Sequence, residues 1–374
     1  MIYLDSAATT LQKPRAVAKS AARAVNRLSS PGRGGHPAAM AAAEAAYACR
    51  EKAARLFNVR DPSNIVFTAN ATHGLNLAIK GVIRRGQRAL VSGYEHNSVI
   101  RPLTAAGAEI TVAASELFEP ETAVFAFERR LNEGVALVVC NHVSNVFGYI
   151  LPAERIAALC RARGVPFILD ASQSAGTIDI DFEAFGADFI AMPGHKGLYG
   201  PQGTGLLLCK RNPGTLIEGG TGSNSLLPEM PDFLPDGLEA GTHNMPGIAG
   251  LSAGLDFVLR RGAGKILEHE QSLIEDAAGS LMMTDGVRVF KSEHRYCQGG
   301  VLSFTVEGVP CEEVGEALAK RGFAVRTGLH CAPAAHRTAG TLNTGTVRLS
   351  VSAFNTRREL RAFADAAREL VKDR

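Results

Sequence analysis

A lysine and an aspartate stand at the ends of two apolar runs in the middle of the chain. Asp170 closes the run 167–170, and Lys196 follows the run 189–192 within Pro193-Gly-His195-Lys196-Gly. Partial burial lowers the pKa of a lysine, so that its neutral amine can form a Schiff base with an aldehyde. A carboxylate at a strand end needs a cation, and a protonated pyridine nitrogen is one. The pair predicts a site for pyridoxal 5′-phosphate.

Each residue alone has a simpler interpretation. A carboxylate that follows a strand can cap the next turn, as Asp170 could, and Lys196 could be a solvated lysine in a surface turn. Because both residues come at the ends of strands expected to lie in one sheet, their combination favours the cofactor site over these alternatives.

Two other strand ends offer complementary groups. Ala71 and Thr72 begin a predicted helix directly after a strand, where free backbone amides and a hydroxyl suit a phosphate. His96 follows the strand that ends at Ser92, and its imidazole could stack on a flat ring. As single motifs both are weak, because helices commonly start with such residues anyway.

Cys331 lies in a loop bounded by glycine and proline, with His330 beside it and Arg326 five positions earlier. Nearby positive charge raises the thiolate fraction of a cysteine, and the thiolate is the reactive form. The other six cysteines lie mostly in apolar surroundings and are expected in the core. Arg326 and Arg348 are candidates for a bidentate grip on a substrate carboxylate, with structural ion pairs as the alternative.

These residues must be positioned by an alternation of strands and helices. Apolar strands alternating with helical segments of ten to fifteen residues predict an α/β fold with a mostly parallel sheet covered on both faces. Ligands bind such sheets beyond the carboxyl ends of the strands. Seven strands are predicted, at 65–68, 89–92, 110–112, 136–140, 167–170, 189–192 and 206–209.

A long loop over 214–246 and a helix over 247–261 lead to a region of different character. Strands are expected there at 301–306, 323–327 and 347–351, followed by an amphipathic helix from Thr356. We therefore predict a large domain over 15–250 and a smaller α+β domain over 251–374 that carries Cys331. Residues 1–14 are expected to pack with the small domain.

The composition of the 374 residues is that of an ordinary globular protein, with 46% hydrophobic and 21% charged residues. A net charge of +3 is too small to indicate nucleic acid. The apolar runs are too short to span a bilayer, and no signal peptide is visible. Seven cysteines without a CxxC pair argue against disulfides or zinc, so a cytoplasmic protein is expected.

Taken together, the chain resembles the class V aminotransferase family, specifically its cysteine desulfurase and selenocysteine lyase branch. The resemblance covers essentially the whole chain, and its Arg-x-Gly-x-His-Cys segment resembles one subgroup of that branch. Its ordered marks are Tyr3-Leu-Asp-Ser-Ala-Ala-Thr-Thr10, Glu95-His-Asn97, His142-Val-Ser-Asn145, Asp170 with Gln173, Gly194-His-Lys196, Tyr199-Gly-Pro201, Glu239-Ala-Gly-Thr242 and Arg326-Thr-Gly-Leu-His-Cys331.

The resemblance implies a fold-type I homodimer with both active sites at the subunit interface. It implies that Lys196 holds the cofactor aldehyde, Asp170 the ring nitrogen and Gln173 the phenolic oxygen, with His96 on the ring face. Cys331 would take sulfur from cysteine as a persulfide. The remaining implied roles are phosphate binding by Ala71, Thr72, His195 and Thr242 of the other subunit, and substrate binding by Asn145, Arg348, Arg326 and His36.

One departure concerns the phosphate. Pro193 stands three residues before the lysine, where the family often has serine or threonine, and Ala71 stands where a second hydroxyl is common. The expected activity is conversion of L-cysteine to L-alanine, with sulfur passed on to an acceptor protein. The alternatives are a selenocysteine lyase, another class V reaction such as transamination, epimerisation or carbon–sulfur cleavage with Cys331 inessential, and a non-catalytic scaffold.

Overall fold

A seven-stranded sheet forms the centre of the larger part of the molecule. The computed structural model describes residues 1–32 and 34–372. The strand order is β2-β8-β7-β6-β5-β3-β4; β8 is antiparallel to both of its neighbours and the other pairs are parallel. The predicted α/β fold is therefore confirmed. The strands are β2 (Ile65–Thr68), β3 (Arg88–Ser92), β4 (Glu109–Ala113), β5 (Val135–Asn141), β6 (Phe167–Asp170), β7 (Phe189–Pro193) and β8 (Gly205–Cys209).

Helices bury both faces of this sheet, which explains why its strands are apolar throughout. Neighbouring residues of β5 point to opposite faces, so that Val138 and Val139 belong to two different apolar clusters. On the Val139 side lie α3 (Ala71–Val82) and α4 (Asn97–Ala105). The Val138 side is covered by α2 (Pro37–Phe57), α5 (Pro120–Leu131), α6 (Ala153–Ala162), α7 (Phe182–Phe185) and α8 (Met245–Arg261).

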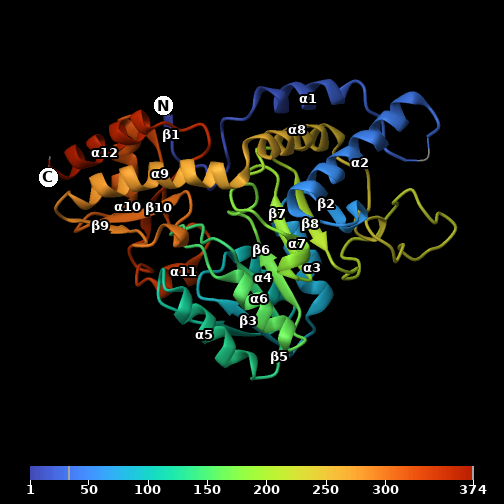
Figure 1. Cartoon of the computed structure of the whole chain (residues 1–374), viewed down its shortest axis with the longest axis horizontal. Coiled ribbons are helices and arrows are strands. Elements are labelled where there is room, and N and C mark those ends of the chain that lie inside the picture. Colours follow the sequence, from blue (N-terminus) through green and yellow to red (C-terminus); the bar gives the residue numbers. More distant parts are fainter. Residues whose placement is uncertain (33, 373–374) are drawn as a thin grey trace.

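A second, four-stranded antiparallel sheet, ordered β12-β13-β10-β9, forms the smaller part (Figure 1). The long helix α9 (Ala263–Met282) packs against it together with α10 (Cys311–Lys320) and α12 (Arg357–Lys372). Helix α1 (Arg15–Val25) lies along α8. The strands of the small sheet are β9 (Val287–Phe290), β10 (Val301–Val306), β12 (Arg326–Gly328) and β13 (Thr346–Ser350). Helix α11 (Pro333–Thr338) lies between β12 and β13 in the sequence.

The strand expected at 323–327 is in fact two strands that join different sheets. β11 (Phe323–Ala324) pairs in parallel with β1 (Ile2–Tyr3), whereas β12 pairs with β13. Phe323 is buried in the apolar cluster of the small part while Arg326 is exposed, so the chain changes partner between them. The predicted domain boundary at 250/251 falls inside α8, and the domain division stays a prediction.

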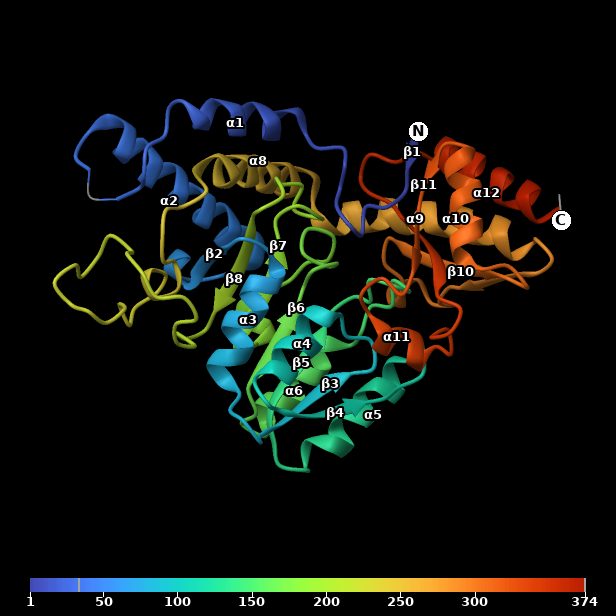
Figure 2. The ribbon, with the colours of Figure 1, turned by 180° about the vertical axis from the view of Figure 1, so that it is seen from behind.

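The segment between β8 and α8 is an extended arm that leaves the body of the molecule (Figure 2). It contains one short 3₁₀ helix, Asp236–Leu238, and the side chains of Ile217, Leu226 and Leu227 are exposed on it. Across residues 1–32 and 34–372, no helix combines the length and apolar character needed to cross a membrane.

Candidate active site

The carboxyl ends of β5, β6 and β7 open into a pocket with an empty volume of about 530 Å³, including the part open to solvent. This is within the ~300–1,000 Å³ typical of ligand sites. The pocket therefore lies beyond the carboxyl ends of the parallel strands, where a ligand was expected. Eight of the predicted site residues line the pocket: Ala71, Thr72, His96, Asn145, Asp170, Gln173, His195 and Lys196.

Lys196 follows the end of β7 and shares the pocket with Asp170. Burial lowers the pKa of the Lys196 ammonium to about 8, with the carboxylate of Asp170 opposing this and the charge of Arg348 adding to it. A substantial fraction of the amine is therefore neutral near physiological pH. Asp170 is buried at the end of β6, where its Oδ1 accepts a hydrogen bond from the Ser172 amide at 2.9 Å. Lys196 thus follows one strand and Asp170 ends the neighbouring strand, as predicted.

His96 is the N-terminal cap of α4, and its orientation is set by Ser98. The Ser98 amide donates to His96 Nδ1 at 3.1 Å, so neutral His96 carries its proton on Nε2. Burial lowers the pKa of His96, and the charge of Asp170 raises it. The hydroxyl of Ser98 lies 2.9 Å from His96 Nδ1 and 2.8 Å from the hydroxyl of Thr72.

Ser98 also lines the pocket, and sequence reasoning missed it. Its position two residues after His96, in the first turn of a helix that starts at the same sheet edge, was the available signal. It brings a second hydroxyl beside Thr72, where Ala71 and Pro193 have none.

The start of α3 and His195 both line the pocket. Asn70 caps α3 by accepting from the His73 amide at 2.9 Å, and the amides of Ala71 and Thr72 begin the helix. Burial, followed by the charge of Lys196, lowers the pKa of His195 to about 4, so the ring is neutral at pH 7. Within the described residues its buried Nδ1 has no hydrogen-bond partner.

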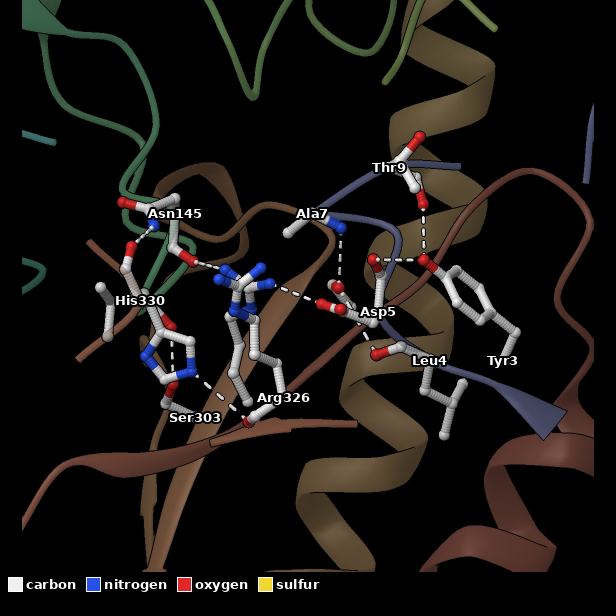
Figure 3. Close-up of polar contacts among 12 residues, drawn as sticks. Tyr3, Leu4, Asp5, Ala7, Thr9, Asn145, Ser303, Arg326 and His330 are labelled. Carbon is white, nitrogen blue, oxygen red and sulfur yellow. Dashed lines mark hydrogen bonds and ion pairs between the residues drawn. The ribbon is translucent and has the colours of Figure 1, made fainter. Parts of the chain in front are cut away.

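Arg348 is part of β13 and contacts Asn145, and its side chain is only 2% exposed. Its Nη2 contacts Asp5 Oδ1 at 2.6 Å and its Nη1 donates to the backbone oxygen of Asn145 at 2.9 Å. Figure 3 shows Asp5 and Asn145. Among the described residues, Arg348 Nε and Asn145 Oδ1 are buried without a hydrogen-bond partner. One of these atoms is a donor and the other an acceptor, and both are unpaired.

Cys331 is the one exposed cysteine of the seven; the other six are buried, as predicted. Its loop is tied to the pocket, because the Asn97 amide donates to Cys331 O and Asn145 Nδ2 donates to His330 O, each at 2.8 Å. Both His330, with φ 52°, and Cys331, with φ 56°, adopt the left-handed conformation. The thiol is thus presented on a strained turn beside α4.

The expectation that His330 supplies positive charge to the thiol is wrong. His330 is buried, and burial together with the charge of Arg348 lowers the pKa of His330 to about 2. The ring is uncharged at any pH at which the protein would work. Arg326, whose side chain is exposed, is the cation that remains in this segment.

Other predicted site residues have different surroundings. Gln173 Nε2 donates to Ala7 O at 3.0 Å, at the edge of the pocket. His36 caps the start of α2, where its Nδ1 accepts from the Ala39 amide at 3.4 Å, and Thr242 lines a neighbouring cleft with His73. Neither His36 nor Thr242 lines the pocket of its own chain.

The donor set fits pyridoxal phosphate. A partly neutral lysine, a buried carboxylate and an imidazole line one pocket, together with two hydroxyls, the start of α3 and His195, whose Nδ1 is unpaired among the described residues. The described residues hold no cluster of three metal-binding side chains.

Comparison with known proteins identifies the family of the chain. The family model described as aminotransferase class-V matches residues 2–363. A probable cysteine desulfurase of Methanothermobacter thermautotrophicus is 30% identical over 99% of this chain and 94% of that protein. One from Xylella fastidiosa is 33% identical over 98% of this chain and 90% of that protein.

Solved structures of cysteine desulfurases share the fold. The apo enzyme of Thermococcus onnurineus superposes with a TM-score of 0.90 at 29% identity, covering 100% of this chain and 95% of that one. The enzyme CsdA of Escherichia coli has a TM-score of 0.83 at 28% identity, covering 98% of this chain and 94% of that one.

Proposed function

The chain belongs to the aminotransferase class-V family, and on that basis we propose that it is a pyridoxal-phosphate-dependent cysteine desulfurase. The observation that supports this most is the exposed thiol of Cys331 on a strained turn. The backbone of this turn accepts hydrogen bonds from the Asn97 amide and from Asn145 Nδ2. A different reaction of this family would not need a thiol there.

Bound in the pocket, pyridoxal phosphate would supply an aldehyde for the substrate amine and an electron-accepting ring. We assign Lys196 to the aldehyde, Asp170 to the ring nitrogen, His96 to the ring face and Gln173 to the phenolic oxygen. The phosphate is assigned to the hydroxyls of Thr72 and Ser98, the first amides of α3 and His195. Ser98 replaces the contact that Pro193 cannot make.

The substrate carboxylate is assigned to Arg348 Nε and to the second N–H of Asn145 Nδ2, whose first N–H goes to His330 O, with exposed Arg326 in support. Lys196 Nζ moves protons to and from the substrate, which a pKa of about 8 allows near neutral pH. The thiolate of Cys331 then attacks the substrate sulfur. A sulfur–sulfur bond forms on Cys331 as the carbon–sulfur bond breaks, and a proton delivered to carbon completes L-alanine.

We further propose that the protein is a cytoplasmic homodimer that passes its sulfur to an acceptor protein. His36 and Thr242, which lie outside the pocket of their own chain, would contribute to the pocket of the second copy. Both residues are exposed on their own chain, which supports a contact with a second copy.

The test is turnover of L-cysteine by the wild type, Cys331→Ala and Cys331→Ser, with alanine and sulfide both measured in the presence of a reductant. We expect the wild type to release both products and the two variants to release neither. Lys196→Ala is the control that removes every cofactor-dependent reaction.

Alanine formation that persists in both Cys331 variants would exclude the proposed sulfur transfer. A requirement for an added 2-oxo acid would indicate transamination instead. The same assay with selenocysteine decides between sulfur and selenium as the preferred element.

A further inference from the structure

His336 is a buried histidine close to Cys331 in the sequence, and the proposed reaction does not use it. It belongs to α11, five residues after the thiol, and it is fully buried. Its Nε2 lies 3.4 Å from His330 Nδ1, and its Nδ1 lies 2.8 Å from the hydroxyl of Thr341. His330 Nε2 in turn lies 3.4 Å from the backbone oxygen of Arg326 (Figure 3).

The two imidazoles meet edge to edge. Their planes differ by 13° and their centroids are 5.6 Å apart, while the facing nitrogens are 3.4 Å apart. The difference, 5.6 − 3.4 = 2.2 Å, is about the sum of two ring radii, so the nitrogen–nitrogen line runs along both planes. This is the arrangement of an in-plane N–H···N hydrogen bond.

Because both rings are neutral, the acceptor at the Arg326 end sets the direction of the hydrogen bonds in this chain. The Arg326 carbonyl can only accept, so His330 Nε2 carries the proton of that ring. Burial lowers the pKa of His330 to about 2 and that of His336 to about 4, and both rings are neutral. His330 Nδ1 therefore accepts from His336 Nε2, and His336 Nδ1 accepts from the Thr341 hydroxyl.

We infer that His336 is a positioning residue for Cys331. Through the chain Thr341 → His336 → His330 → Arg326 carbonyl, it connects the segment after the thiol to the segment before it. The turn between them holds two non-glycine residues in the left-handed conformation, which the chain adopts only where its surroundings enforce it. Asn97 and Asn145 donate hydrogen bonds to the backbone of this turn. The hydrogen bond between His330 and His336 joins the residues on its two sides.

This inference deepens the proposed desulfurase function and rests on it for its kinetic part. The first measurement is independent of activity: the ring nitrogens of ¹⁵N-histidine-labelled protein are followed by NMR. We expect a neutral His330 with the proton on Nε2, unchanged down to about pH 5. In His336→Phe, which keeps a ring but no donor, the signal of His330 Nδ1 should shift. A proton on Nδ1 of wild-type His330 would overturn the inference.

The second measurement is single-turnover transfer of sulfur to Cys331. His336→Phe should slow it about tenfold to a hundredfold, as expected for a displaced nucleophile, and leave KM and the visible spectrum of the bound cofactor unchanged. His336→Gln, which retains an N–H toward His330, should restore most of the rate. Transfer at the wild-type rate in His336→Phe would overturn the inference.

If His336→Phe does not fold, Thr341→Val carries the test, because it removes only the last hydrogen bond of the chain. A slower transfer with unchanged KM supports the positioning role, and a wild-type rate contradicts it. A wild type that releases no alanine would count against the proposed function, while the NMR result would still decide the hydrogen-bond chain.

Discussion

Arg348 Nη2 lies 2.6 Å from Asp5 Oδ1, so the buried guanidinium on β13 is paired with a carboxylate from the first residues of the chain. An unpaired charge in this position would be strongly destabilising. Asp5 and the Asn145 carbonyl occupy Nη2 and Nη1, and Nε has no hydrogen-bond partner among the described residues. The arginine is therefore oriented before any substrate arrives.

This arrangement predicts that Arg348→Lys raises KM for cysteine about tenfold to a hundredfold, because an ammonium group cannot serve Asp5, Asn145 and a substrate carboxylate in a planar array. Steady-state kinetics with cofactor-saturated protein measures this. Arg326→Lys, at an exposed position, is the matched control and should change KM much less. The reverse ranking would assign the carboxylate to Arg326.

The pKa of Lys196 predicts how the apoprotein captures its cofactor. Burial lowers this pKa to about 8, and the neutral amine is the form that reacts with an aldehyde. The rate of reconstitution with pyridoxal phosphate should rise about tenfold per pH unit below pH 8 and level off above it. Stopped-flow absorbance follows the reaction, and Lys196→Ala provides the baseline. A rate that still climbs steeply between pH 9 and 10 would indicate an ordinary lysine.

Ser98 offers a test of the phosphate wall. Ser98→Ala should weaken pyridoxal phosphate binding about tenfold, the cost of one hydrogen bond to a charged group. Binding of pyridoxal, which lacks the phosphate, should change little, and this comparison separates a phosphate contact from an indirect effect through His96. Fluorescence titration of the apoprotein gives both constants, with Thr72→Val as the positive control. Equal losses for the two ligands would place Ser98 away from the phosphate.

Glu270, on α9, predicts a pH-dependent stability. Burial raises the pKa of this carboxyl from 4.5 to about 8, so the folded protein retains a proton that the unfolded chain releases. The protonated carboxyl contributes fully to the free energy of unfolding below about pH 4.5. This contribution is lost as the pH rises from there through about 8. Glu270→Gln keeps the shape without the charge. It should raise the free energy of unfolding at pH 9 by about 1 to 3 kcal/mol and leave it unchanged at pH 4.

Urea unfolding at the two pH values measures this effect. Glu239→Gln is the matched control, because Glu239 forms an ion pair with Arg50 at 2.5 Å and its loss should destabilise the protein at pH 9. An equal gain for Glu270→Gln at both pH values would show that packing, not ionisation, is responsible.

Much of the fold was readable from the sequence because its strands are buried on both faces. The bounds of β2, β6 and β10 match the expected apolar runs, and the rule for strand ends located Asp170, Lys196 and His96. Short elements were missed, since the two residues of β1 and the alternating pattern of β9 give little local signal.

Properties that depend on distant contacts could not be predicted. The charge state of His330 follows from its burial, and a sequence shows only that an arginine and a cysteine are near it. The division between β11 and β12 follows from pairing with β1, more than three hundred residues away. Arg348 and Asp5 are 343 positions apart in the sequence, and no local pattern predicts their pairing.

That long-range pairing has a consequence for how the protein is made. The parallel contact of β1 with β11, the ion pair of Asp5 and the bond from the Ala7 amide to Ser350 Oγ at 2.8 Å all join the start of the chain to its end. Residues 2–7 are therefore synthesised more than three hundred residues before the partners that they contact. The seven strands of the large sheet lie between residues 65 and 209 and can form before Arg348 is synthesised, whereas the ion pair with Asp5 forms only afterwards.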